Sequence, residues 1–288
     1  MALSIRRLRD DFGAEISGVD LTRPIDEAIF AAIRDAFDEY SVLVFPGQKF
    51  DDESQIAFSR RFGPLETTIS TNSGGGTHIA DISNVDPKTN EIIPVDGWLS
   101  KYNSGNEMWH TDSSFKPVPA LASLLSGREV PPVGAETEFA SMRIAYDDLS
   151  AAEQDRLEGL VAVHDFSYSR GLVDPKLMDE KQSAAVPPVR QAVIRTNPAN
   201  GRKAFYSGSH AREIVGWPVE EGRALLKDLV ARAVKPERVY THKWRQFDLV
   251  IWDNRCILHR GRPWDKSRHR RVMHRTTVAG DGPTVPDQ

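Results

Sequence analysis

The stretch Asn106–Phe115 reads NEMWHTDSSF and places a histidine and an aspartate two residues apart beside aromatic and apolar neighbours. We expect this stretch to form an extended strand. Side chains at positions i and i+2 of a strand point to the same face, so His110 and Asp112 would point together while Thr111 points away. An imidazole and a carboxylate on one face can hold a divalent cation. Taken alone, such a pair is more often a surface histidine beside a surface aspartate.

Two downstream segments extend the pair. Cys256–His259 (CILH) brings another histidine to the apolar edge of an expected strand, and Arg271, Met273 and Arg275 share one face of a further strand. Guanidinium groups on such a face need anions, which a carboxylate supplies in bidentate geometry. The alternative for these arginines is a solvated face or structural ion pairs. Two histidines and one carboxylate with open positions form the ligand set of non-haem Fe(II) oxygenases.

Composition excludes several classes of protein. The formal net charge of −4 argues against nucleic acid or an anionic membrane as a partner. No apolar run approaches the roughly 20 residues of a membrane span, and the first residues show no signal-peptide pattern. The single cysteine, Cys256, excludes an intramolecular disulfide and a zinc site built on several thiolates. We therefore expect a cytoplasmic protein.

Hydrophobic periodicity and turn residues predict many short strands and a few helices. The expected helices cover residues 26–40, 52–62, 151–160 and 219–234. The expected strands lie near residues 14–23, 41–45, 78–85, 106–115, 121–130, 136–142, 191–196, 203–207, 237–244, 248–253, 256–260 and 270–279. Residues 66–77 are expected to be a glycine-rich mobile loop and residues 166–190 to be irregular. This order favours a β-sandwich or barrel with flanking helices over alternating βαβ units.

Seven segments spread over nearly the whole chain form a specific set. They are Ser41–Gln48 (SVLVFPGQ), Gln55–Leu65 (QIAFSRRFGPL), Asp81–Val85 (DISNV), Trp109–Phe115 (WHTDSSF), Gly134–Phe139 (GAETEF), Trp252–Gly261 (WDNRCILHRG) and Arg271–Gly280 (RVMHRTTVAG). Together they resemble the Fe(II)/2-oxoglutarate-dependent dioxygenases of the taurine dioxygenase and 2,4-dichlorophenoxyacetate dioxygenase family. Within them, Trp252–Arg255 (WDNR) is interpreted as turn architecture, because Asp and Asn favour turns.

The resemblance implies a double-stranded β-helix (jelly roll) in one domain, residues 1–288, with lid-like loops near residues 66–105 and 166–190. It implies Fe(II) as the metal and 2-oxoglutarate and O2 as cosubstrates. The residues to which it gives roles are the iron ligands His110, Asp112 and His259, the 2-oxoglutarate-binding Thr137 and Arg271, and the substrate-binding candidates Arg275, Asn106 and His210. The family also implies a homo-oligomer, a dimer or a tetramer.

The motifs lie closer to the phenoxyacetate branch than to the taurine branch. The resemblance therefore implies a small organic anion as substrate, most simply an aryloxyalkanoate whose ether is cleaved to a phenol and an oxo acid. A taurine, alkyl-sulfonate or alkyl-sulfate dioxygenase is the alternative enzyme, and a non-catalytic small-acid binding protein is the alternative class. Where the family often has Arg-Thr-His-Pro, this chain has Asn197 in place of the histidine. Substrate contacts near Asn197 are therefore expected to differ.

Overall fold

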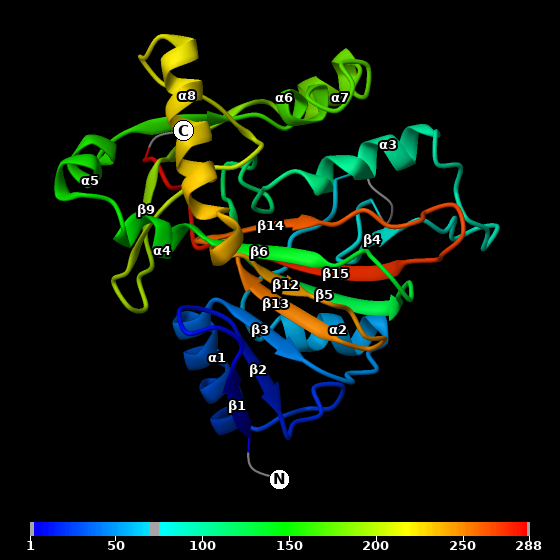
Figure 1. Ribbon diagram of the computed structural model, residues 1–288. Helices are drawn as coiled ribbons and strands as arrows, with labels where there is room; N and C mark the ends of the chain where they lie inside the picture. The colour runs from blue at the N-terminus through cyan, green and yellow to red at the C-terminus, as the bar shows by residue number, and fades with distance from the viewer. Residues whose placement is uncertain (1–2, 70–74, 287–288) are drawn as a thin grey trace.

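The computed structural model describes residues 3–69 and 75–286. Its largest element is a seven-stranded sheet with the strand order β1–β2–β3–β13–β5–β15–β4 (Figure 1). These strands are β1 (Ser4–Arg7), β2 (Ala14–Ser17), β3 (Val42–Phe45), β13 (Leu249–Asp253), β5 (Ala120–Glu129), β15 (Val272–Ala279) and β4 (Ala80–Ser83). Neighbours run antiparallel except β2 and β3, which run parallel.

Both faces of the central strands are covered. In β13, Leu249 and Ile251 belong to the apolar cluster that contains buried residues of α1 (Glu27–Tyr40) and α2 (Asp52–Ser59). Val250 and Trp252 belong to the cluster on the other face. Because successive side chains of a strand alternate between faces, a strand buried on both sides is rich in apolar residues. This accounts for the apolar sequences of β3 and β13.

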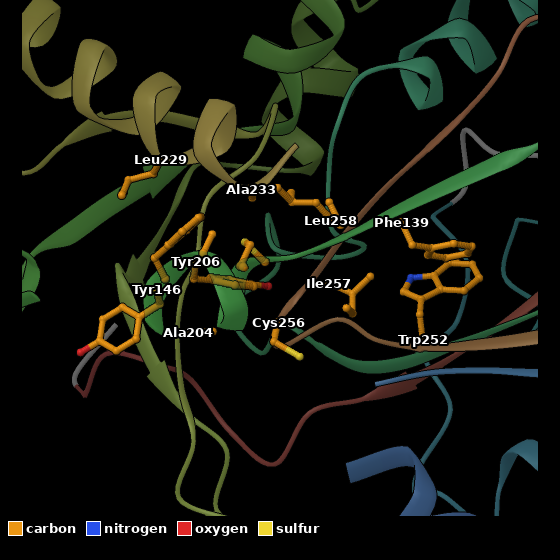
Figure 2. Close-up of a cluster of buried hydrophobic side chains, with 14 of the residues drawn as sticks. Phe139, Tyr146, Ala204, Tyr206, Leu229, Ala233, Trp252, Cys256, Ile257 and Leu258 are labelled. Carbon is orange, nitrogen blue, oxygen red and sulfur yellow. The ribbon is translucent and has the colours of Figure 1, made fainter. Parts of the chain in front are cut away.

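A three-stranded sheet forms the second layer, with the order β12–β6–β14. Its strands are β12 (Tyr240–His242), β6 (Thr137–Ser141) and β14 (Ile257–Gly261). Phe139 of β6 meets Trp252 of the large sheet with ring centroids 5.6 Å apart, and Figure 2 shows the two rings side by side. Leu229 and Ala233 of α8 (Val219–Ala233) belong to the same cluster, and Figure 2 shows Leu229 at the end away from these two rings.

Shorter elements complete the layer around α8. They are α4 (Met142–Asp147), α5 (Ala151–Leu157), β7 (Val161–His164), β8 (Val189–Ala192), β9 (Ile194–Thr196), β10 (Lys203–Phe205), β11 (Ala211–Ile214) and η2 (Pro236–Arg238). β11, β7 and β8 form a three-stranded sheet, and β9 pairs with β10. None of the described helices is long and apolar enough to cross a membrane.

The four expected helices are confirmed as α1, α2, α5 and α8. Side-chain caps fix where α1 and α2 begin: the Asp26 carboxylate accepts from the backbone N–H of Ile29 at 2.8 Å, and Asp51 and Ser54 cap each other's backbone N–H groups. The expected mainly β fold with flanking helices is confirmed as well.

Two local expectations are wrong. Residues 106–115 do not form a strand: η1 (Gly105–Glu107) is followed by a single bridge between His110 and His259 and then by a turn in which Ser113 has φ 57°. Residues 166–190 are not wholly irregular, because they contain α6 (Phe166–Gly171) and α7 (Glu180–Ala185). Each of these helices has 6 residues, too few for a helical period to show in the sequence.

The segment 66–105 also contains regular structure, namely β4 and α3 (Trp98–Ser104). The expected glycine-rich lid at residues 66–77 lies partly outside the described residues. Figure 1 shows α3, α6 and α7 on the side of β6, β14 and β15 that is remote from α1 and α2.

Candidate active site

The bridge between two remote segments brings the histidines together. The N–H of His110 donates to the carbonyl of His259 at 3.1 Å and the N–H of His259 donates back at 2.8 Å, which places their ring centroids 4.2 Å apart. The Asp112 carboxylate lies 3.6 Å from His259 Nε2 and 4.0 Å from His110 Nε2. All three side chains are buried, and each offers a ligand atom within 4.8 Å of the other two. The predicted metal ligands therefore converge, although a turn and not a strand brings Asp112 to the site.

Burial and neighbouring charges together set the protonation states of the three side chains. Desolvation lowers the pKa of His110 below its ordinary value, and it lowers the pKa of His259 well below it. Burial opposes ionisation of Asp112, but the Arg275 guanidinium and the two imidazoles outweigh it and hold its pKa well below the usual range. Neutral imidazoles and an ionised carboxylate are the forms that ligate metals, so these residues fit a divalent ion.

Polar side chains hold Asp112 in place. The Ser123 hydroxyl donates to Asp112 Oδ2 at 2.7 Å, and the Asn254 side-chain amide donates to the Ser123 hydroxyl at 2.9 Å. Asn254 Oδ1 accepts from the backbone N–H of Asp112 at 3.1 Å, and the Thr111 hydroxyl donates to the Asn254 carbonyl at 2.7 Å. The WDNR segment thus fixes the orientation of a metal-ligand candidate, a role that its interpretation as turn architecture missed.

Two adjoining cavities open at the triad. We call the first the Arg271 cavity, because Arg271 lines it and not the second. We call the second the His210 cavity, because His210 lines it and not the first. Their shared lining residues are Ile82, Asn103, Asn106, His110 and Arg275. Every predicted site residue lines at least one of them: Thr137, Arg271 and His259 the first, Asp112 and His210 the second, and His110, Asn106 and Arg275 both.

The Arg271 cavity contains a buried cation without a counter-ion among the described residues. Burial lowers the pKa of Arg271 to about 10, and its Nε has no hydrogen-bond partner there. The nearby Thr137 hydroxyl accepts from the indole N–H of Trp244 at 2.9 Å, which leaves the hydroxyl proton of Thr137 for another acceptor. A guanidinium and a hydroxyl donor in one cavity fit a carboxylate.

The His210 cavity combines aromatic rings with cations. Phe115 and Phe166 pack around His210, with ring centroids 5.0 and 5.7 Å from its imidazole. Burial, and then the neighbouring His110, keeps the pKa of His210 well below its ordinary value, and its Nδ1 hydrogen-bonds the Ser169 hydroxyl at 2.9 Å. Arg275 contacts the Asp112 carboxylate through Nη1. The roles predicted for Arg275, Asn106 and His210 towards a substrate stay predictions.

The sequence indicates no role for Arg170 and links Asn197 to the substrate. Arg170 lines the His210 cavity but belongs to α6, within a segment that was expected to be irregular. Asn197 contacts Arg255 and Asp38, and it lines neither cavity at the triad. Asn197 therefore belongs to a buried ion-pair network away from both cavities, and the expectation about substrate contacts near it stays a prediction.

Comparisons with known proteins agree with this geometry. The family model described as "Taurine catabolism dioxygenase TauD, TfdA family" matches residues 4–277. The "Alpha-ketoglutarate-dependent 2,4-dichlorophenoxyacetate dioxygenase" of Cupriavidus pinatubonensis is 41% identical over 283 residues, 96% of this chain and 98% of that protein. The "(S)-phenoxypropionate/alpha-ketoglutarate-dioxygenase" of Sphingobium herbicidovorans is 38% identical over 97% of this chain and 96% of its own.

A more distant relative and a solved structure complete the comparison. The "Alkylsulfatase" of Acinetobacter baylyi is 29% identical over 97% of this chain and 86% of its own. The crystal structure of AAD-2 in complex with Mn(II) and N-oxalylglycine superposes with a TM-score of 0.92 and 41% identity over 100% of both chains. The predicted resemblance to the phenoxyacetate branch is confirmed by these identities. The chain belongs to the TauD, TfdA family of taurine catabolism dioxygenases.

Proposed function

We propose that this protein is an Fe(II)/2-oxoglutarate-dependent dioxygenase that hydroxylates an aryloxyalkanoate. One observation carries the proposal: a buried set of two neutral histidines and one ionised carboxylate adjoins a cavity with the buried Arg271, which pairs with no carboxylate among the described residues. Two histidines and a carboxylate leave open metal positions, as non-haem Fe(II) oxygenases require. The names of the relatives at 38% and 41% identity support the reaction class.

One group of residues would bind the metal and another would bind the cosubstrate. His110, Asp112 and His259 would hold Fe(II), and Arg271 with the Thr137 hydroxyl would hold the distal carboxylate of 2-oxoglutarate. When bound, Fe(II) with 2-oxoglutarate and O2 supplies an oxidant for a C–H bond and yields succinate and CO2. The protein's own part is to orient both partners and to exclude water, because positioning decides which C–H reacts.

The His210 cavity supports an aromatic acid as the substrate. Phe115, Phe166 and Tyr102 give this cavity an aromatic lining against which an aryl ring can pack, and Arg275 offers a cation for its carboxylate. Hydroxylation at the carbon beside the ether oxygen gives a hemiacetal, which collapses to a phenol and an oxo acid. Asn106 and His210 would contact the substrate from the same cavity.

The proposal extends to the whole chain. The seven-stranded and three-stranded sheets, packed through Phe139 and Trp252, support a double-stranded β-helix. We assign residues 1–288 to one domain in which the described parts of the segments 66–105 and 166–190 cover the site. A cytoplasmic location follows from the single cysteine of the chain. A homo-oligomer, dimer or tetramer, follows only from the family resemblance, and light scattering after size-exclusion chromatography tests its size.

Succinate release from a substrate panel tests the function. With Fe(II), 2-oxoglutarate and O2, we expect phenoxyacetate to stimulate succinate formation well above taurine or an alkyl sulfate, with one phenol per succinate. Stimulation by taurine or the sulfate alone would establish the alternative enzyme. His110→Ala should abolish the stimulated rate. If the wild-type protein bound metal yet gave neither succinate nor a visible band with Fe(II) and 2-oxoglutarate under anaerobic conditions, the non-catalytic binding protein would be correct.

A further inference from the structure

Arg170 is a second buried guanidinium at the site. It comes from α6, is 6% exposed and lines the His210 cavity together with Arg275, Asp112 and His110. Its partners are neutral: Nη2 donates to the Asn106 side-chain carbonyl at 3.3 Å, and the Tyr102 side chain hydrogen-bonds the guanidinium. The Arg170 guanidinium also lies over the rings of Tyr102 and Phe166, 4.9 and 4.6 Å from their centroids.

Several other buried or half-buried arginines of this chain pair with carboxylates. Arg255 contacts Asp253 and Asp38, Arg260 contacts Glu138, and Arg212 contacts Asp165. Among the described residues, Arg170 forms no ion pair, and its Nε has no hydrogen-bond partner. A buried charge without a counter-ion is costly, so such groups are normally paired. An anion that enters from outside the protein would remove that cost.

The two carboxylates of the cavity do not neutralise Arg170. Asp112 is contacted by Arg275 and hydrogen-bonded by Ser123, and it belongs to the metal triad. Asp81 also lines the cavity, but burial raises its pKa, and one of its oxygens has no partner in the described structure. Arg275 is therefore engaged at the triad, while Arg170 lines the same cavity and pairs with neither carboxylate.

We propose that Arg170 binds the carboxylate of the substrate and makes the His210 cavity selective for anions. The inference rests on the proposed function and deepens it, because it gives the two guanidiniums different roles. Arg170 has the substrate carboxylate as its only anionic partner, whereas Arg275 contacts the metal ligand Asp112 as well as the substrate. The aryl group of the same molecule would pack against the aromatic lining of this cavity, which includes Phe115. An aryl ring joined to a carboxylate by a short linker is the chemistry that fits both.

Gly105 sets the position of Arg170. A Cβ at residue 105 would lie 1.7 Å from Arg170 Nη1, closer than atoms can approach. The backbone of Gly105 has φ −56° and ψ −23°, which any residue adopts without strain. Gly105→Ala therefore displaces the guanidinium while its charge is kept, whereas Arg170→Met removes the charge and keeps most of the side-chain volume.

Equilibrium binding separates this role from a structural one. Phenoxyacetate and its uncharged analogue phenoxyethanol are titrated by calorimetry into anaerobic protein loaded with Mn(II) and 2-oxoglutarate. For Arg170→Met we expect about a tenfold or greater loss of phenoxyacetate affinity, since hydrogen bonds to charged groups are among the stronger ones. The affinities for phenoxyethanol and for 2-oxoglutarate should change little. Gly105→Ala should show the same selective loss, and Arg170→Lys should recover part of it.

The possible outcomes distinguish the role of Arg170 from the proposed function. Equal losses for the anion and the alcohol, or an unchanged phenoxyacetate affinity in both variants, would overturn the role of Arg170 and leave the proposed function standing. If the wild-type protein bound none of phenoxyacetate, phenoxypropionate or benzoate, the proposed function and the inference would fall together. Arg223→Met, on α8 outside both cavities, is the matched control and should leave all affinities unchanged.

Discussion

At the scale of single residues, Asp112 shows how two neighbours orient one carboxylate. Oδ2 accepts from the Ser123 hydroxyl at 2.7 Å, while Oδ1 is contacted by Arg275. Ser123 can donate to Asp112 because it receives a hydrogen bond from the Asn254 amide at 2.9 Å. The chain of donors has one direction, from Asn254 through Ser123 to Asp112. Partners that orient metal ligands commonly change metal affinity by about 10- to 100-fold when they are removed.

Reversing that direction should weaken metal binding without unfolding the protein. In Asn254→Asp, the new carboxylate accepts where the amide donated, so the Ser123 hydroxyl turns away from Asp112. We expect about a 10-fold or greater loss of Mn(II) affinity by calorimetry, and a similar loss for Ser123→Ala.

Ser59→Ala is the matched control for these two variants. It also removes a buried hydroxyl, one that hydrogen-bonds the Gln55 carbonyl at 2.7 Å, but Ser59 lies on α2 and lines neither cavity at the triad. The Mn(II) affinity of this variant should be unchanged. Unaltered affinity in both site variants would show that Asp112 needs no such support.

At the scale of elements, a buried ion-pair network ties α1 to the turn between β13 and β14. Arg255 donates to Asp253 and to Asp38 of α1, each at 2.8 Å, and to Asn197 at 3.1 Å. The same turn carries Asn254, which contacts Asp112. The network lines neither cavity, yet it holds in place the turn whose Asn254 orients the metal-ligand candidate Asp112.

The network predicts how stability depends on pH. Burial raises the pKa of Asp38, but the hydrogen bond and charge of Arg255 outweigh it, so the folded pKa lies below the ordinary value. A lowered folded pKa gives a stabilisation that is complete above the unfolded pKa of about 4 and is lost as the pH falls through the folded one. Asp38→Asn should therefore cost about 1 kcal/mol in urea unfolding at pH 7. That difference should shrink below about pH 4. Asp35→Asn on the same helix is the control, and a difference that is equal at all pH values would contradict the assignment.

At the scale of the whole molecule, the sequence predicts the helices and strands that neighbouring residues determine. It misses the contacts that form only when remote segments pack together. Capped helices such as α1, with Asp26 before an apolar period, were predictable, as were strands bounded by turn residues. His110 and Asp112 do converge, but through another local structure than the predicted strand, because the turn at Ser113 follows a bridge between His110 and the remote His259. Arg170 was missed because nothing in its sequence neighbourhood indicates that its guanidinium contacts the Asn106 side chain at the site.

The site joins segments that are remote in the chain, so ligands should stabilise the fold in two separate steps. His110 and Asp112 follow η1, His259 lies on β14, and Arg271 directly precedes β15. A ligand at about 100 times its Kd stabilises the folded state by about 2.7 kcal/mol, which for a chain of 288 residues raises Tm by roughly 4–5 °C. We expect Mn(II) to give one increment in a thermal scan and N-oxalylglycine, added after Mn(II), to give another. Chelation of the metal should remove both.

Arg271→Met separates the two steps. The metal increment needs only the triad and should persist, whereas the N-oxalylglycine increment should be lost, because its distal carboxylate would no longer meet a guanidinium. Arg245→Met, whose side chain is 65% exposed, should retain both increments. Since ligand-free Arg271 is a buried charge without a counter-ion in the described structure, Arg271→Met should also melt no lower than the wild-type protein before any ligand is added. A lower Tm of the ligand-free variant, or an intact second increment, would mean that Arg271 serves the fold and not the cosubstrate.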